Sequence, residues 1–268
     1  MNDLNRAQLR ARYRITGRIV MDTALHIGGR GATTVTDSPI IRDGEGRPFI
    51  PGSSLKGAFR AAVERIVPNI PGLHTCGLSD ADGACANQLR ERTKDRQLEE
   101  VEMLALLDKV LCDTCRTFGT THLASVALFH DAPISKIWRE LPEVPTQIRD
   151  GVGIDRDSER AREGIKFDFE VVPPQTSFDF TLLLENPSDR DLELVAMGLQ
   201  EFIGGMIPLG GIRSRGLGRC HLEEVMAQKV DLSDPETLKT YLLERRWIEE
   251  PVDEFIKTHL STLLREEE

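Results

Sequence analysis

A short stretch of the chain, DSPIIRDGEGRPFIPGSSLKGAFRAAVERI (residues 37–66), places a carboxylate ahead of a cationic helix start. Asp37 lies in a loop, and Lys56 and Arg60 lie about one helical turn apart just after Pro51-Gly52. The first turn of a helix has unpaired N–H groups and a partial positive charge, so it favours anions such as phosphate. A carboxylate beside such a pocket is a candidate general base, or a ligand that holds a divalent cation such as Mg²⁺ against a phosphate.

The same stretch also fits an ordinary amphipathic helix that follows a turn. Ser53 is in the right place for an N-cap, and Ser54 lies beside it. The spacing of a nucleotide-binding Walker loop, G-x-x-x-x-G-K-[ST], is absent. The residues alone leave both interpretations of this helix open.

A second candidate is the glycine-rich segment LGGIRSRGLGR, residues 209–219. Its glycines, among them Gly210 and Gly211, allow the backbone to approach a ligand closely, and three arginines supply positive charge. Those arginines are Arg213, Arg215 and Arg219. The pattern fits a cradle for a sugar-phosphate backbone, and the alternative is a simple turn.

The cysteines form a third candidate site. Cys112 and Cys115 have C-x-x-C spacing, and Cys76 and Cys85 complete a set of four, with His74 as a substitute ligand. Four such ligands in a reducing compartment favour structural zinc, which would stabilise an insertion that lacks a core. Free thiols and a redox dithiol remain alternatives, and Cys220 is expected in the core.

Further polar and basic residues flank these motifs. His26 lies at the far end of the loop that leads to Asp37, and Arg42 precedes a predicted hairpin turn at residues 43–46. Residues 142–166 are polar and rich in arginine, and are expected to form an exposed excursion between strands. The basic residues singled out there are Arg156, Arg160 and Lys166.

The formal charge of −10 is unevenly distributed along the 268 residues. Residues 80–113 have nine acidic and five basic side chains, and residues 231–268 have eleven and five. These two segments account for all of the excess, so the remaining chain is neutral and its basic clusters face no overall acidic background. We expect no membrane span and no secretory signal, and therefore a cytoplasmic protein.

Hydrophobic periodicity predicts the order of the main elements. A strand is expected at residues 12–21, a helix at 53–66, further strands near 124–134, 166–172 and 177–185, and a helix at 191–206. The strands at 166–172 and 177–185 are expected to pair with each other across PPQT. The predicted fold is α+β, a ferredoxin-like antiparallel sheet with helices on one face.

The predicted organisation is one domain with a tail. Residues 1–230 form the domain, with a cysteine-rich insertion at about 68–120 and a second insertion at 142–166. Residues 231–268 form an acidic extension of two short helices, each with a proline near its start.

Four segments together resemble a known family. LHIGG, DSPIIRDGEGRPFIPGSSLKGAFR, IDR…GIKFDFEVV and GGIRSRGLGR, in this order, resemble the RAMP-superfamily backbone subunits of type III CRISPR–Cas effector complexes, the Csm-three or Cas-seven type. The resemblance covers residues 12 to about 225. It implies an RRM-like fold that polymerises along a CRISPR RNA, with a thumb hairpin within residues 142–166 and zinc in the cysteine-bearing insertion.

The resemblance also implies roles for the candidate residues. Asp37 would be the catalytic residue that cuts complementary target RNA, in a metal-dependent reaction. The basic, glycine and serine residues of the motifs above would bind RNA by its backbone. Implied partners are CRISPR RNA, target RNA, neighbouring backbone subunits, the large polymerase-like subunit and the small subunits. The alternatives are a scaffold that does not cleave and a guide-processing endonuclease, which would need a histidine near the first helix.

Overall fold

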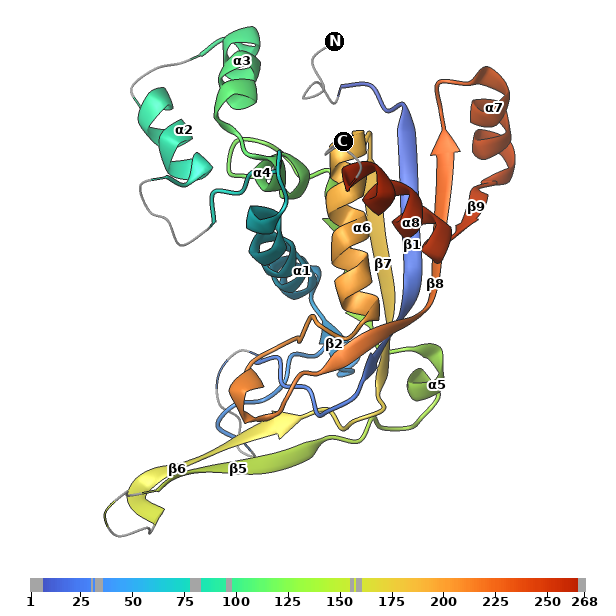
Figure 1. The fold of residues 1–268 in the computed structure, drawn as a ribbon. Coiled ribbons are helices and arrows are strands. Elements are labelled where there is room, and N and C mark those ends of the chain that lie inside the picture. The colour runs from blue at the N-terminus through green and yellow to red at the C-terminus, as the bar shows by residue number, and fades with distance from the viewer. Residues whose placement is uncertain are drawn as a thin grey trace.

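A five-stranded antiparallel sheet forms the centre of the computed structural model (Figure 1). β1 (Ala11–Met21) is the middle strand and pairs with β7 (Ser177–Glu185) and β8 (Cys220–Asp231). The edge strands are β3 (Ala127–Phe129) beside β7 and β9 (Ile248–Pro251) beside β8. The structure describes residues 7–29, 31, 36–77, 83–94, 98–154, 157 and 161–264, with backbone alone at 153–154 and 161–166.

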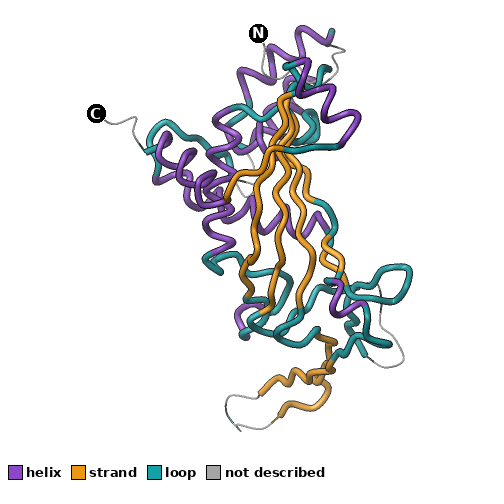
Figure 2. Tube along the Cα trace, turned by 90° about the vertical axis from the view of Figure 1, so that its right-hand side faces the viewer, coloured by secondary structure: helices purple, strands orange, loops and turns teal. Residues whose placement is uncertain are grey.

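The two faces of the sheet differ as the alternation in β1 predicts. Ile15, Ile19 and Met21 are fully buried on one face. The neighbouring strands add their own alternating apolar residues to the same core, and these are Phe178, Phe180, Leu182, Leu184 and Leu222. Three helices cover this face, namely α1 (Gly52–Ile66), α6 (Asp189–Ile203) and α8 (Val252–Leu263). In Figure 1, α6 and α8 lie in front of the strands and α1 lies beside α6, and Figure 2 shows the helices largely to one side of the strands.

Helices α1 and α6 pack closely because one glycine makes room. A Cβ atom on Gly198 of α6 would lie 2.1 Å from Cε1 of Phe59, so only glycine fits beside that ring. Helix α6 begins with a capping box in which Ser188 and Asp191 exchange hydrogen bonds. The core is therefore built around a close contact between the two main helices.

The start of α1 differs from the prediction for Ser53. Helix α1 begins at Gly52 with Pro51 as its N-cap, so Ser53 lies inside the first turn and does not cap it. The carboxylate of Asp131 accepts the Gly52 N–H at 2.7 Å from across the fold. A distant aspartate thus caps this helix, which is the reason a local serine is not needed.

The predicted pairing of residues 166–172 with 177–185 is wrong. β5 (Gln147–Ile154) and β6 (Ala161–Val171) form their own two-stranded sheet, whereas β7 pairs with β1 and β3. Figures 1 and 2 show this hairpin projecting from one end of the molecule. The PPQT segment therefore carries the chain from the hairpin back to the central sheet. A second small sheet pairs β2 (Phe49–Ile50) with β4 (Ala132–Pro133), and α5 (Lys136–Arg139) follows it.

The insertion after α1 is helical. A 3-10 turn at Val67–Asn69 ends α1, and the insertion then holds α2 (Cys85–Thr93), α3 (Glu100–Val110) and α4 (Asp113–Phe118). Helix α3 lies within the segment LEEVEMLALLDKVL, residues 98–111. Its small apolar cluster, built around Leu89 and Leu107, is separate from the main core.

The C-terminal residues are integrated with the domain. The two predicted helices are present as α7 (Pro235–Glu244) and α8, but the chain between them also adds β9 to the sheet. Phe255 of α8 is fully buried in the main core. On the opposite face, the Tyr241 hydroxyl accepts from Arg12 at 3.1 Å and the Arg14 guanidinium lies 4.5 Å from the Trp247 ring centroid. This segment therefore covers part of the basic outer face of β1.

Candidate functional site

Asp37 lies against the base of the β5–β6 hairpin. Its N–H donates to Asp168 Oδ1 at 2.8 Å, and its own Oδ2 accepts the Asp168 N–H at 3.2 Å. The next residue, Ser38, forms an isolated parallel bridge with Phe169, and its carbonyl accepts the Glu170 N–H at 3.0 Å. The predicted catalytic carboxylate is thus exposed, but its backbone is fixed along strand β6.

The His26 side chain links the Asp37 loop to strand β6 of the hairpin. The ring is buried, with Nδ1 2.7 Å from the Glu170 carbonyl and Nε2 3.3 Å from Ser38 Oγ. It also packs edge-on against Phe169, with 5.7 Å between the ring centroids. These contacts give His26 a structural role within the fold, and its contact with RNA remains a prediction.

The glycine-rich segment folds over the backbone of His26. Gly211 N–H donates to the His26 carbonyl at 2.9 Å. A Cβ on Gly210, which has φ of +75°, would lie 2.3 Å from that same oxygen, so the position requires glycine. Arg213 and Arg215 follow in a short 3-10 turn and are exposed, as is Arg219.

The glycine-rich segment therefore lies next to the Asp37 loop, with His26 between them. We call this region the hairpin base, defined by residues 24–29, 36–42, 167–172 and 209–219. The Arg215 guanidinium lies 5.9 Å from the Phe167 ring centroid, which links the segment to β6 as well. Three motifs far apart in sequence thus form one surface with exposed cations and an exposed carboxylate.

Arg42 has a buried partner in the hairpin base. Its Nη2 atom donates to Glu170 Oε1 at 2.5 Å, and its Nη1 donates to the Gly46 carbonyl at 2.8 Å. The Glu170 carboxylate also accepts from Thr146 Oγ1 and from the Ile40 N–H. Burial acts to raise the pKa of Glu170, but these hydrogen bonds outweigh it and the pKa is lowered.

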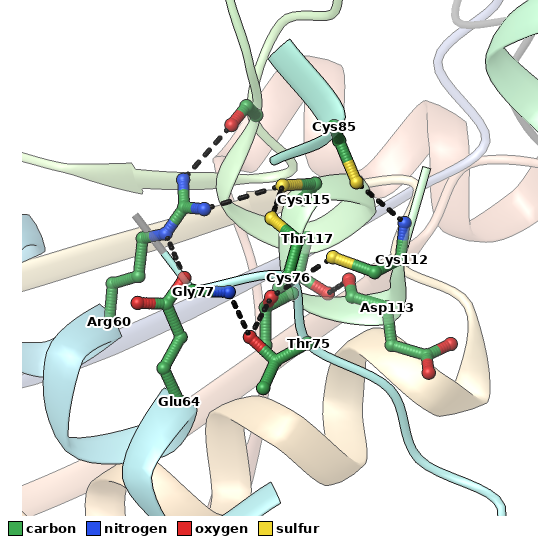
Figure 3. Close-up of polar contacts among 12 residues, drawn as sticks. Arg60, Glu64, Thr75, Cys76, Gly77, Cys85, Cys112, Asp113, Cys115 and Thr117 are labelled. Carbon is green, nitrogen blue, oxygen red and sulfur yellow. Dashed lines mark hydrogen bonds and ion pairs between the residues drawn. The ribbon is translucent and has the colours of Figure 1, made fainter. Parts of the chain in front are cut away.

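Arg60 on α1 points to the cysteines. It donates to Glu64 at 2.7 Å, to the Gly119 carbonyl at 3.1 Å and to Cys115 Sγ at 3.3 Å, and only 12% of its side chain is exposed (Figure 3). Lys56 is half-buried, and burial followed by repulsion from Arg60 lowers its pKa. The structure therefore gives Arg60 a set of protein partners, and its contact with a phosphate remains a prediction. Ser53 is exposed in the first turn of α1 and Ser54 is half-buried.

The four cysteines of the insertion form a compact cluster. The sulfur atoms of Cys76, Cys85, Cys112 and Cys115 all lie within 4.8 Å of one another (Figure 3). His74 lies outside this group, with 80% of its side chain exposed and Nδ1 3.9 Å from Asp113. The prediction of His74 as a substitute ligand is therefore not supported by this geometry, because the cysteines already supply four donors.

The thiols in the cluster strongly affect one another. A hydrogen bond from Cys115 lowers the pKa of Cys112 to about 4, and the same contact raises the pKa of Cys115. Burial raises the pKa of Cys85 to about 12. Soft sulfur donors at these separations match the ligand set of a tetrahedral zinc site. Cys220 lies apart in the main core, as predicted.

The predicted residues of the hairpin tip are outside what the structure describes. Arg156 and Arg160 lie outside the described residues, and for Lys166 the backbone alone is described, as part of β6. The sequence prediction in turn missed Asp168 and Glu170. The alternation in KFDFEVV marks both as residues of one strand face, but nothing local indicates that they meet Asp37 and Arg42.

Comparison with known proteins assigns the family. The family model of the RAMP superfamily matches residues 18–221, from β1 into β8. This chain belongs to the RAMP superfamily. The resemblance read from the four motifs is thereby confirmed.

Several relatives of this RAMP protein share one name among themselves. It is 28% identical over 244 residues to the CRISPR system Cms endoribonuclease Csm3 of Methanocaldococcus jannaschii, with 81% of each chain covered. It is 28% identical over 226 residues to the protein of that name from Streptococcus thermophilus, covering 82% of this chain and 91% of the relative. A shorter match to the Enterococcus italicus protein of that name is 46% identical over 66 residues, or 23% of this chain and 31% of that one.

Within the described residues, no helix is both long and apolar enough to cross a bilayer.

Proposed function

We propose that this RAMP protein is a backbone subunit of a type III CRISPR RNA-guided complex, and that it binds CRISPR RNA and cleaves complementary target RNA at regular intervals. The observation that carries the proposal is the position of Asp37. It is exposed at the hairpin base, which also contains the exposed arginines of the glycine-rich segment. The relatives named CRISPR system endoribonucleases support the same function.

The proposed RNA contacts follow from charge and backbone access. Gly211 is exposed, although its N–H donates to the His26 carbonyl, and Gly210 beside it is half-buried. The side chains of Arg213, Arg215 and Arg219 are exposed in the same segment of the hairpin base. Such groups bind a sugar-phosphate backbone without reading its sequence. A subunit that accepts any guide needs this kind of contact, because base pairing between guide and target supplies the specificity.

In the proposed reaction the target's 2′-hydroxyl oxygen attacks the adjacent phosphorus, and the bond from phosphorus to the 5′-oxygen of the next nucleotide breaks. That oxygen leaves and takes a proton from water, which gives a 2′,3′-cyclic phosphate and a 5′-hydroxyl end. The β5–β6 hairpin, acting as a thumb, would kink the target and bring these groups into line. The Asp37 carboxylate takes the proton of the hydroxyl as it attacks. A divalent cation such as Mg²⁺ fits the exposed carboxylate oxygens of Asp37, and when bound it would neutralise charge on the phosphate.

We further propose that the cysteine cluster holds structural zinc. The support is the chemistry and spacing of the four sulfur donors, which lie within 4.8 Å of one another. Zinc there would stabilise the insertion.

We also propose that the core is ferredoxin-like. The core elements follow one another in the chain in the order β1, α1, β3, β7, α6 and β8, and their strands lie in the sheet in the order β3-β7-β1-β8. A cytoplasmic complex with neighbouring copies, a large polymerase-like subunit and small subunits completes the proposal.

The experiment replaces Asp37 in the assembled complex. We expect Asp37→Ala to reduce cleavage of a labelled complementary RNA by at least roughly 100-fold, the usual contribution of a positioned proton acceptor, while guide binding is unchanged. The matched control is Glu45→Ala, which removes an exposed carboxylate from the nearby turn and should cleave normally. Cleavage by Asp37→Ala at the original rate and positions would refute the catalytic role and leave a scaffold that does not cleave.

A further inference from the structure

The contact between Asp37 and β6 is reciprocal and involves one further acid. Asp168 Oδ1 accepts the Asp37 N–H at 2.8 Å, while the Asp168 N–H donates to Asp37 Oδ2 at 3.2 Å. The first bond fixes the backbone of residue 37, and the second fixes the direction of its carboxylate. The first bond needs the Asp168 side chain, whereas the second uses the backbone N–H of that residue.

The surrounding contacts make this attachment rigid. The Glu170 N–H donates to the Ser38 carbonyl, and Ser38 forms an isolated parallel bridge with Phe169 of β6. Buried His26 holds both sides through Ser38 Oγ and the Glu170 carbonyl. The Ile40 N–H donates to Glu170 Oε2 at 3.1 Å. Ser38 and Ile40 are thus held by hydrogen bonds to Glu170 and His26, and Asp168 is the residue that contacts Asp37 itself.

We propose that Asp168 is a positioning residue that fixes Asp37 on the hairpin, so that the carboxylate and the hairpin move as one unit. This inference rests on the proposed catalytic role of Asp37. The hairpin then determines the cleavage position in two ways, because it bends the target RNA and also holds the Asp37 carboxylate. An Asp37 that turned freely in its loop would lose the near-attack geometry that makes a positioned group effective.

Three variants of the assembled complex, each with a labelled complementary RNA at saturating concentration, test this inference. We expect Asp168→Ala to lower the maximal cleavage rate by roughly 10- to 100-fold without changing target affinity, because a small displacement of a reacting group has this cost. We expect Asp168→Asn to restore most of the rate, because its amide oxygen still accepts the Asp37 N–H. The matched control is Asp150→Ala, which removes the carboxylate directly opposite Asp168 in the hairpin register and should cleave normally.

The outcomes separate the two proposals. Wild-type rates in Asp168→Ala, or equal losses in the Ala and Asn variants, would overturn the positioning role, even if Asp37→Ala is inactive. Full activity in Asp37→Ala would overturn the proposed function and this inference with it. Thermal unfolding of each variant distinguishes a loss of folding from a loss of cleavage rate. If Asp168→Ala and Asp168→Asn have equal melting temperatures and only Asp168→Asn restores the rate, the difference comes from positioning alone.

Discussion

At the hairpin base, buried residues hold an exposed carboxylate, whereas in the cysteine-rich insertion (about residues 68–120) the cysteine thiols are themselves partly or fully buried. Asp37 faces solvent while His26 and Glu170 beneath it are buried. The four sulfurs of the insertion face one another, and Arg60 closes one side of them. The first arrangement suits a ligand that must come and go, and the second suits one that stays.

The two regions also differ in what stabilises them. The hairpin base is joined to the sheet by backbone hydrogen bonds, and its residues Leu25, Ile40 and Val172 pack in the main core. The insertion has only a small apolar cluster of its own around Leu89 and Leu107. A segment with so little core depends on a cross-link such as a metal. Changes to each region should therefore have different consequences, and four predictions test this difference.

The largest effect is expected from loss of the proposed zinc. Structural zinc contributes on the order of 10 kcal/mol in small domains. Chelation, or Cys112→Ser, should abolish hydrogen-exchange protection in α2–α4, while β1 and β7 remain protected. Elemental analysis should find about one zinc per chain in the wild type and in the control Cys220→Ala, whose thiol lies in the main core. A metal-free wild-type protein with full protection in the insertion would contradict the prediction.

The second effect concerns the ion pair between Arg60 and Glu64 within α1, on the side of the helix that contacts the insertion. Arg60 and Glu64 are 12% and 11% exposed, so Arg60→Met leaves a buried carboxylate without its partner. We expect a loss of about 3 kcal/mol in the free energy of unfolding, measured in urea. The double variant Arg60→Met with Glu64→Leu should recover most of it, because the unpaired charge is gone. If both variants are equally unstable, packing rather than charge explains the loss.

The third effect is a pH dependence at the hairpin base. The pKa of Glu170 is lowered from its ordinary value of 4.5 by hydrogen bonds that outweigh burial. Its contribution to stability is therefore fully present above pH 4.5 and disappears as the pH falls through the lowered value.

The Glu170→Gln variant tests that dependence. It should lose about 1–3 kcal/mol at pH 7, and the difference from wild type should shrink in acid. Urea unfolding at several pH values measures both. Glu45→Gln, in an exposed turn, is the control and should differ by less than about 0.5 kcal/mol at any pH. A constant difference between wild type and Glu170→Gln would show that the carboxylate charge is not the cause.

The smallest effect is expected from the exposed arginines. Replacing Arg213 and Arg215 together by alanine should leave folding intact and weaken guide binding. Each lost phosphate contact lowers the slope of log affinity against log salt by about 0.7 for a single strand, so the pair should lower it by about 1.4. Arg246 and Lys257, exposed cations near the C-terminus, provide a control double variant with an unchanged slope.

The sequence alone determined the elements whose signals are local. The alternation of apolar residues in β1 follows from burial of one strand face, and the C-x-x-C spacing with two more cysteines follows from the geometry of a soft-ligand site. Pro235 and Pro251 marked the starts of α7 and α8, because proline needs no N–H partner there. In each case a few neighbouring residues contain the whole physical reason.

Only the tertiary structure decided what each charged side chain meets. Arg60 has the sequence context of a phosphate ligand, but α1 packs beside the insertion and turns it towards Cys115. Asp131 replaces Ser53 as the partner of the first turn of α1 from 79 residues away. Asp168 meets Asp37 because β6 pairs with β5 and not with β7, and pairing between strands depends on contacts that no local pattern records.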